Sequence, residues 1–206
     1  MIGYRTQKSL QWCLVFMAVL LLAGCISRSA PTVNYYSLLT MEQMGDTEAL
    51  TSLPEVKLGV GPVSIPDSLK RSQIATRKQG NRYEFAEFHR WAGVLEKDIT
   101  VVLGDNLGQL LGIEKVGFFP WLQHFKPTYR VMVDVIRFDG AIDGEAFLSA
   151  RWAISNSKGK DFLAGKKSDY RQPLEDASYA ALIKAESQLL GALSREIAAE
   201  IVALKK

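Results

Sequence analysis

The chain is poor in the residues on which most catalytic and metal sites depend. Its 206 residues include only two cysteines and two histidines. It has no Gly-x-Ser-x-Gly elbow, no Gly-rich phosphate loop and no His, Cys and carboxylate cluster at metal-ligand spacing. Either His89 or His124 could act as a base, but a structural or surface role is the simpler interpretation. We therefore expect a protein that is not an enzyme and that has no catalytic residue, metal or cofactor.

Two further scarcities narrow the function. Lys and Arg number 25 against 22 Asp and Glu, so the formal net charge is only +3. Binding to nucleic acid needs a concentrated basic face, and we therefore expect no nucleic-acid partner. The longest apolar run covers residues 12–22. That is about half of the ~20 residues that a membrane-spanning helix requires.

The apolar run instead has the features of an export signal. Arg5 and Lys8 precede it, and Leu22-Ala23-Gly24-Cys25 follows it, as in a bacterial lipobox. Small residues at 23 and 24 suit the subsites of a signal peptidase, and the thiol of Cys25 would accept a diacylglyceryl group. We predict a signal peptide at 1–24, cleavage between Gly24 and Cys25, and a covalent lipid on Cys25. A plain secretory signal or an uncut anchor is the alternative.

The residues after Cys25 indicate which membrane holds the protein. An Asp directly after the lipidated cysteine commonly retains Gram-negative lipoproteins in the inner membrane, and this chain has Ile26 there. We therefore predict the periplasmic face of the outer membrane. Several acyl chains on one residue give stable attachment, because each buried methylene contributes about 0.8 kcal/mol. Residues 25–32 form a polar tether of at most about 25–30 Å when extended.

The mature chain is long enough for one domain. Removing 24 of 206 residues leaves 182 and takes away Arg5 and Lys8, so the formal net charge falls to +1. Cys13 leaves with the signal and Cys25 carries lipid, so neither can form a disulfide. We predict a single domain over residues 33–206 that is stabilised by its hydrophobic core.

Periodicity predicts an α+β domain. We expect strands at 33–39, 56–63, 73–78, 82–88, 129–138, 145–154 and 160–170. One amphipathic helix begins after Gly93 and ends at Gly112, and a second begins at a cap formed by Asp176 or Ser178 and runs to the C-terminus. The expected architecture is a largely antiparallel β-sheet packed on one face by these two helices, a two-layer sandwich.

Polar and small residues within these elements have simple structural interpretations. Gly104 and Gly108 lie four residues apart in the first helix; they favour the close approach of another backbone over a ligand-facing surface. Asp134 and Arg137 in one strand and Glu145 and Arg151 in the next could form ion pairs across the hairpin.

The segment after the first helix is a candidate contact site. Phe118, Phe119, Trp121 and Leu122 surround Pro120. Consecutive apolar residues cannot all face one core from a loop, so an exposed patch here would bind lipid or a partner protein. A buried strand end is the alternative.

These features in this order resemble the ABC-type transport auxiliary lipoproteins, the PqiC-like family that accompanies MCE-domain lipid transport systems. The resemblance covers nearly the whole mature chain, and no single motif carries it. The matching stretches are Tyr35-Tyr36-Ser37-Leu38 after the lipobox, Val60-Gly61-Pro62-Val63 with Ile65-Pro66, 69–74 with Thr76-Arg77, Arg90-Trp91-Ala92, Asn106-Leu107, the pattern over 129–152, and Tyr179-Ala180-Ala181-Leu182. The chain departs from the family pattern at Lys70, at Ser72 and at Gly93-Val94.

The resemblance implies a non-catalytic role. An outer-membrane lipoprotein of this kind would serve an ABC- or MCE-type system that moves phospholipid or another hydrophobic molecule between the two membranes. Its partners would be a periplasm-spanning MCE-domain protein and its inner-membrane components, and several copies could form a homo-oligomer. The alternative is a periplasmic carrier that binds lipid on its own.

Overall fold

The computed structural model describes residues 31–78, 81–122, 124–159 and 161–205. The predicted signal peptide, Gly24 and Cys25 lie outside these ranges. Residues 33–206 form one unit, and the description below concerns that unit.

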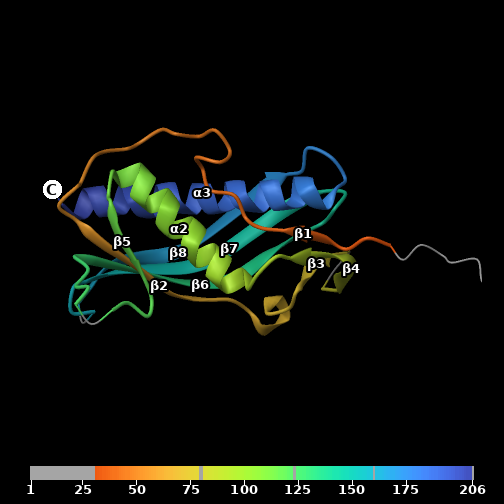
Figure 1. The fold of residues 1–206 in the computed structure, drawn as a ribbon, viewed down its shortest axis with the longest axis horizontal. Helices are drawn as coiled ribbons and strands as arrows, with labels where there is room; N and C mark the ends of the chain where they lie inside the picture. Colours follow the sequence, from red (N-terminus) through yellow and green to blue (C-terminus); the bar gives the residue numbers. More distant parts are fainter. Residues whose placement is uncertain (1–30, 79–80, 123, 160, 206) are drawn as a thin grey trace, which may run out of the picture. The chain divides into compact units, whose positions relative to one another are not determined.

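Three long strands form the antiparallel part of the sheet. These are β6 (Tyr129–Gly140), β7 (Glu145–Asn156) and β8 (Phe162–Pro173), which pair in sequence order (Figure 1). Side chains alternate along β7, where Ala146, Leu148 and Ala150 are buried while the residues between them are partly exposed. This alternation places one face of the sheet against the core and leaves the other accessible.

The other edge of β6 is shared by two sets of strands. β2 (Lys57–Ser64) pairs in parallel with the first half of β6, and β5 (Lys115–Phe118) adds outside β2. β3 (Gln73–Arg77), with β4 (Tyr83–Trp91) and β1 (Asn34–Tyr36) beyond it, joins β6 near its end. A short 3-10 helix, η1 (Asp67–Leu69), lies between β2 and β3. The result is a mixed sheet in which most of the paired residues are antiparallel, as predicted.

Both helices cover the same face of the sheet. α2 (Leu95–Leu111) ends at Gly112, whose φ of 57° is left-handed, as its sequence position predicted. α3 (Tyr179–Leu204) begins at Ser178, whose hydroxyl accepts a hydrogen bond from the Ala181 amide at 3.1 Å. Of the two predicted caps, Asp176 and Ser178, the residue that caps α3 is therefore Ser178. The predicted α+β sandwich is confirmed.

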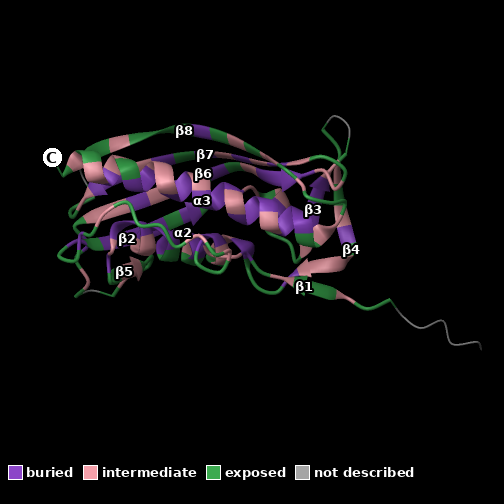
Figure 2. Cartoon of the chain, turned by 90° about the horizontal axis from the view of Figure 1, so that it is seen from above, coloured by how far each residue is buried: buried purple, intermediate pink, exposed green. Residues whose placement is uncertain are grey.

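The core lies between the helices and the inner face of the sheet. In Figure 2 buried positions recur along α3 and along the central strands. Asn106 of α2 is a buried polar member of this layer; its side chain accepts a hydrogen bond from the Met41 amide at 2.8 Å. This bond fixes the long connection after β1 against α2. Within the described residues, neither helix is long and apolar enough to cross a bilayer.

Every strand differs from its predicted bounds by at least one residue, and β5 was not predicted as a strand. Three of the differences affect how the chain is placed around the site. β1 is limited to three residues, because the chain leaves the sheet after Tyr36 to cross over α2. β4 continues to Trp91, whose amide donates to the Ser72 carbonyl at 2.7 Å. β6 continues to Gly140, so Asp139 belongs to a strand and not to a turn.

Candidate functional site

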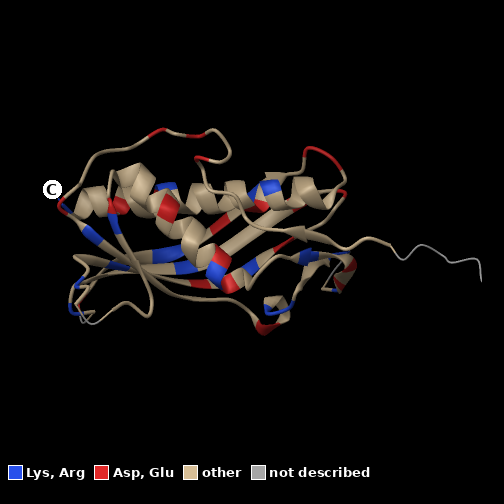
Figure 3. Cartoon of the chain, viewed as in Figure 1, with Lys and Arg blue, Asp and Glu red and all other residues tan. Residues whose placement is uncertain are grey.

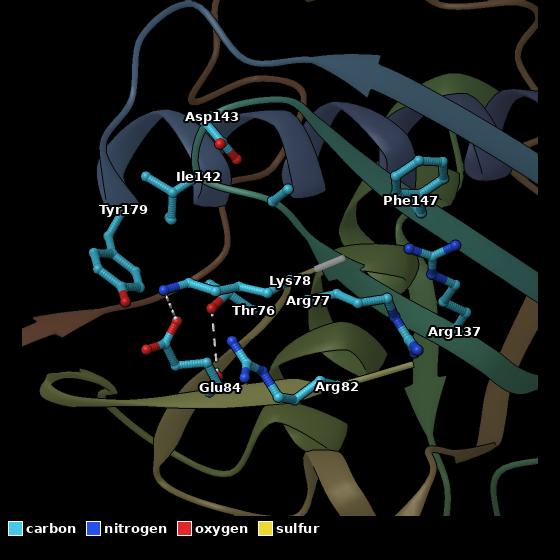
Figure 4. A pocket seen from close by; sticks show the side chains of 11 residues that line it. Thr76, Arg77, Lys78, Arg82, Glu84, Arg137, Ile142, Asp143, Phe147 and Tyr179 are labelled. Carbon is cyan, nitrogen blue, oxygen red and sulfur yellow. Dashed lines mark hydrogen bonds and ion pairs between the residues drawn. The ribbon is translucent and has the colours of Figure 1, made fainter. Parts of the chain in front are cut away.

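A cavity of about 1000 Å³ lies at one end of the sheet. The end of β3, the start of β4, the β6–β7 turn and the first residue of α3 surround it (Figure 4). Its charged lining consists of Arg77, Lys78, Arg82, Glu84, Arg137 and Asp143. Four cationic side chains therefore face two acidic ones. Figure 3 shows this mixture of Lys and Arg with Asp and Glu around β3 and β4.

Asp139 organises two of the arginines from behind the cavity. Its carboxylate is fully buried and accepts hydrogen bonds from Arg77 Nη2 at 2.9 Å and from Arg137 Nε at 2.8 Å. The Tyr83 hydroxyl also donates to this carboxylate, at 3.1 Å. A buried carboxylate is stable only when such partners neutralise it. The same contacts fix the positions of both guanidinium groups.

The charges and the burial in this cluster shift the pKa values of Arg77 and Tyr83. The hydrogen bond to Asp139 is the main cause that raises the pKa of Arg77 above its ordinary value. Burial, together with the charge of Asp139, raises the pKa of Tyr83. Arg77 therefore stays charged and Tyr83 stays neutral and able to donate across the physiological range.

Part of the cavity wall is apolar and aromatic. Ile142, Phe147 and Tyr179 supply it. The Arg137 guanidinium lies over the Phe147 ring at 3.9 Å, and Arg171 lies over the same ring at 5.1 Å. These cation–π contacts hold positive charge beside an apolar surface.

A stack of three rings joins the cavity to the first strand. A hydrogen bond of 2.8 Å links the Tyr36 hydroxyl and Nδ1 of His89. The His89 ring in turn stacks on Tyr179, with centroids 3.9 Å apart. His89 is thus partly buried between two tyrosines, which fits the structural role considered for it. β1, where the chain enters the sheet, lies at the same end of the molecule as the cavity.

The predicted aromatic patch lies at the other end of the sheet. Phe119 and Leu122 are 51% and 68% exposed, while Trp121 is partly buried. Phe119 and Trp121 meet edge to face, with centroids 5.3 Å apart. Phe118 is exposed as well, at 36%, so the buried alternative is excluded for Phe118, Phe119 and Leu122.

Glycines of β2 and α2 leave room for these aromatic residues, because a side chain at each glycine would collide with one of them. A Cβ at Gly61 would lie 2.8 Å from Cβ of Phe119, and one at Gly59 would lie 3.1 Å from the Trp121 ring. Phe118 turns to the other face, where its ring fills the space beside Gly104 of α2. The close approach of another backbone that was expected here is therefore not found at Gly104, where a β5 side chain packs instead; at Gly108 a Cβ would lie 3.2 Å from the Ile113 carbonyl oxygen. Phe118 thus packs against α2, although 36% of the residue remains exposed.

A second, acidic groove of about 880 Å³ lies between α2, β5 and the connection after β1. Glu42, Asp105 and Glu114 contribute to its lining. Burial, reinforced by the charge of Glu42, raises the pKa of Asp105. The two hollows therefore differ in the sign of their charge.

The remaining sequence expectations have simple outcomes. Asp134 does pair with Arg151 across the hairpin, at 3.3 Å, on the exposed face. Arg137 pairs with Asp139 of its own strand instead of with Glu145. His124 is exposed in the β5–β6 loop. Among the residues that the structure describes, no three His, Cys, Asp or Glu side chains gather as a metal site would require.

The cluster around Asp139 was not expected from the sequence. Arg77 and Asp139 are 62 positions apart, and they meet only because β3 joins β6 at Gly140. The one local signal was an acidic residue at an Asp-Gly pair that ends a strand, a pattern equally typical of a turn.

Solved structures share this fold. The crystal structure of an uncharacterized protein matches with a TM-score of 0.66 and 21% identity, over 83% of this chain and 99% of the other. Protein XCC0632 from Xanthomonas campestris matches with a TM-score of 0.62 and 16% identity, over 80% and 92%. The model of a family described as "ABC-type transport auxiliary lipoprotein component" matches residues 36–198. No curated protein matches the sequence.

Proposed function

The chain belongs to the ABC-type transport auxiliary lipoprotein components, and on that premise we propose a more specific role. The protein is a non-catalytic accessory of an ABC/MCE-type system that moves phospholipid or another hydrophobic molecule between the inner and outer membranes. A lipid on Cys25 attaches it to the periplasmic face of the outer membrane. Its partner is a periplasm-spanning MCE-domain protein with inner-membrane ABC components, and several copies assemble on it.

The observation that carries this proposal is the separation of the two ends of the sheet. The chain enters at β1, beside the cavity, whereas the segment after β5, which carries the exposed Phe119 and Leu122, lies at the other end. The twelve residues of β6 connect the two ends, a distance of about 35 Å at ~3.3 Å per residue. A lipid on Cys25 would hold the β1 end within the length of a short tether from the membrane, and the aromatic patch, at the other end of the sheet, would be accessible to a partner protein.

The patch also has the properties of a protein contact. The Trp121 ring lies against Gly59 of β2, and the Phe119 ring meets it edge to face, so the two rings restrict each other and less side-chain entropy would be lost on binding. Aromatic residues at the centre of an interface contribute most of its binding energy. A rigid aromatic pair beside the exposed Leu122 therefore suits a partner that arrives from the periplasm.

The test is a pull-down of the tagged, full-length protein from envelope membranes after gentle crosslinking, read by mass spectrometry. We expect the wild-type protein to recover an MCE-domain protein together with inner-membrane ABC components. The double variant Phe119→Ser/Leu122→Asp should lose at least nine-tenths of that recovery, about a tenfold effect.

A matched control is Val94→Asp. Val94 is also an exposed apolar residue, at 57%, but it precedes α2 as its N-cap, where Asp is favourable. Recovery by this variant should equal that of the wild type. Wild-type protein that recovers no such partner would refute the proposal. If it instead copurified alone with phospholipid, the independent lipid carrier would become the better explanation.

A further inference from the structure

The cavity at the β1 end has more capacity to donate hydrogen bonds than its own acids use. Within the described residues, Arg82 makes no ion pair, and the terminal nitrogens of Arg137 make no hydrogen bond. Lys78 pairs with Glu84 at 2.8 Å, but both side chains are more than half exposed, so this pair exchanges readily with solvent. The unused donors therefore belong mainly to arginines.

Asp139 gives the cavity a fixed geometry and a surplus of positive charge. One carboxylate holds Arg77 and Arg137 together, so the trio retains a net charge of +1. Its side chain is 0% exposed, whereas those of Arg77 and Arg137 are 23% and 32% exposed. The Asp139 carboxylate is therefore shielded from solvent, whereas the two guanidinium groups are accessible. Planar guanidinium groups held in place in this way are suited to bind phosphate oxygens.

The apolar part of the cavity wall indicates which class of phosphate compound fits. Ile142, Phe147 and Tyr179 border the cationic side chains in the same cavity (Figure 4). A free phosphate ion gains nothing from such a wall, whereas a phosphate that carries a glycerol and acyl chains would bury apolar surface there. The lining therefore matches an amphiphile with an anionic head.

The cavity lies at the end of the sheet that is nearest in sequence to the predicted lipid anchor, so the anchoring membrane would be the source of that amphiphile. Tyr179 in its wall stacks on His89, which bonds Tyr36 of β1. Eight residues before Val33 lies the predicted lipid anchor, so this end of the sheet remains within about 30 Å of the anchoring bilayer. We propose that the cavity binds the phosphate-bearing headgroup of an anionic phospholipid. The inference that the ligand comes from the anchoring membrane depends on the proposed function, whereas the inference that the cavity binds a phosphate group does not.

Titration calorimetry tests the site on the full-length, lipidated protein in uncharged maltoside micelles. The probes are three soluble compounds: dihexanoyl phosphatidylglycerol, dihexanoyl phosphatidylcholine and inorganic phosphate. We expect the anionic lipid to bind at least tenfold more tightly than either of the others. The cavity favours net negative charge over the zwitterion, and its apolar wall favours the lipid over the free ion.

Two arginine variants locate the binding. Arg82→Gln should weaken binding of the anionic lipid about tenfold, the effect of one hydrogen bond to a charged group. Arg151→Gln is the matched control, because Arg151 is an exposed arginine of the sheet that pairs with Asp134 outside the cavity; it should bind as the wild type does. Neither residue contacts the buried Asp139, so both variants should keep the wild-type unfolding midpoint.

The opposite outcomes are clear. Equal affinity for the two lipids, or equal effects of the two variants, would overturn the site. Inorganic phosphate that bound as tightly as the anionic lipid would overturn the lipid assignment in favour of a free phosphate. A failed pull-down alongside selective lipid binding would refute the proposed transport partner and leave this site standing.

Discussion

Replacing Glu196 of α3 with Gln should reduce stability at neutral pH and leave it unchanged in strong acid. The Glu196 carboxylate accepts hydrogen bonds from Tyr170 at 2.7 Å and from Ser168, and it pairs with Lys166 of β8 at 2.7 Å. Trp152 of β7 donates to the same carboxylate at 3.3 Å. This side chain therefore ties the middle of α3 to two strands.

The expected magnitude follows from the pKa of Glu196. Burial raises this pKa, but the hydrogen bonds from Lys166, Ser168 and Tyr170 lower it by more, to about 2. The difference from the ordinary value of 4.5 corresponds to at most about 3.4 kcal/mol, at about 1.4 kcal/mol per pKa unit. Lys166 is 56% exposed and Glu196 is 26% exposed, so solvent screens the pair. We therefore expect about 1–2 kcal/mol.

The direction in which the free energy of unfolding changes with pH follows from the lowered pKa of Glu196. A carboxyl whose pKa is depressed by folding binds fewer protons in the folded state than in the unfolded state. Its stabilisation is complete above pH 4.5 and is lost as the pH falls toward 2. The free energy of unfolding of the wild type should exceed that of Glu196→Gln at pH 7, and the difference should shrink steadily below pH 4.5.

Urea unfolding at pH 7, 4 and 3, followed by circular dichroism, measures this difference. Glu200→Gln is the control, because Glu200 lies one turn further along α3 and makes no ion pair or hydrogen bond within the described residues. It should match the wild type at each pH. A gap between wild type and Glu196→Gln that stays constant from pH 7 to pH 3, or has the opposite sign, would refute the reasoning.

Three further predictions concern other parts of the chain. Gly140→Ala should destabilise the protein by about 1–3 kcal/mol in urea, because a Cβ there would lie 2.8 Å from the Glu145 carbonyl oxygen; Gly144→Ala, whose Cβ meets nothing closer than 3.6 Å, should have little effect. Glu186 is fully buried, and its burial raises its pKa well above the ordinary value. The wild type should therefore lose stability as the pH rises above 4.5, whereas Glu186→Gln should not, and unfolding midpoints at pH 5 and 8 would show it. Cys25→Ala should move the protein from the membrane to the soluble fraction while its circular dichroism spectrum stays unchanged; a loss of folding would show that the N-terminal segment belongs to the core.

The strands and helices were largely predictable because each has one buried face. Period-2 alternation in β6 and β7 and the apolar stripes of α2 and α3 are local properties of the sequence. The same holds for the helix ends, where Gly112 and Ser178 occupy the backbone positions that glycine and serine favour. The parallel pairings of β6 with β2 and β3 were not predictable, because strand order depends on contacts between distant segments.

The candidate sites show the same division. The aromatic segment was visible in the sequence, but its exposure was not, because it depends on glycines of β2 that receive Phe119 and Trp121. The cationic cavity was missed entirely. Its three arginines come from β3, from the β3–β4 turn and from β6, and each one alone resembles an ordinary surface residue.

The sequence by itself determined most of the elements, the α+β class and the scarcity of catalytic groups, because composition and short-range periodicity encode them; the lipobox stays a prediction. The tertiary structure alone decided which polar residues act together. Asp139 is buried and bonds Arg77 only because β3 and β6 meet at one residue pair. The two ends of the sheet acquire different chemistry for the same reason: side chains become neighbours through strand order, which no local pattern specifies.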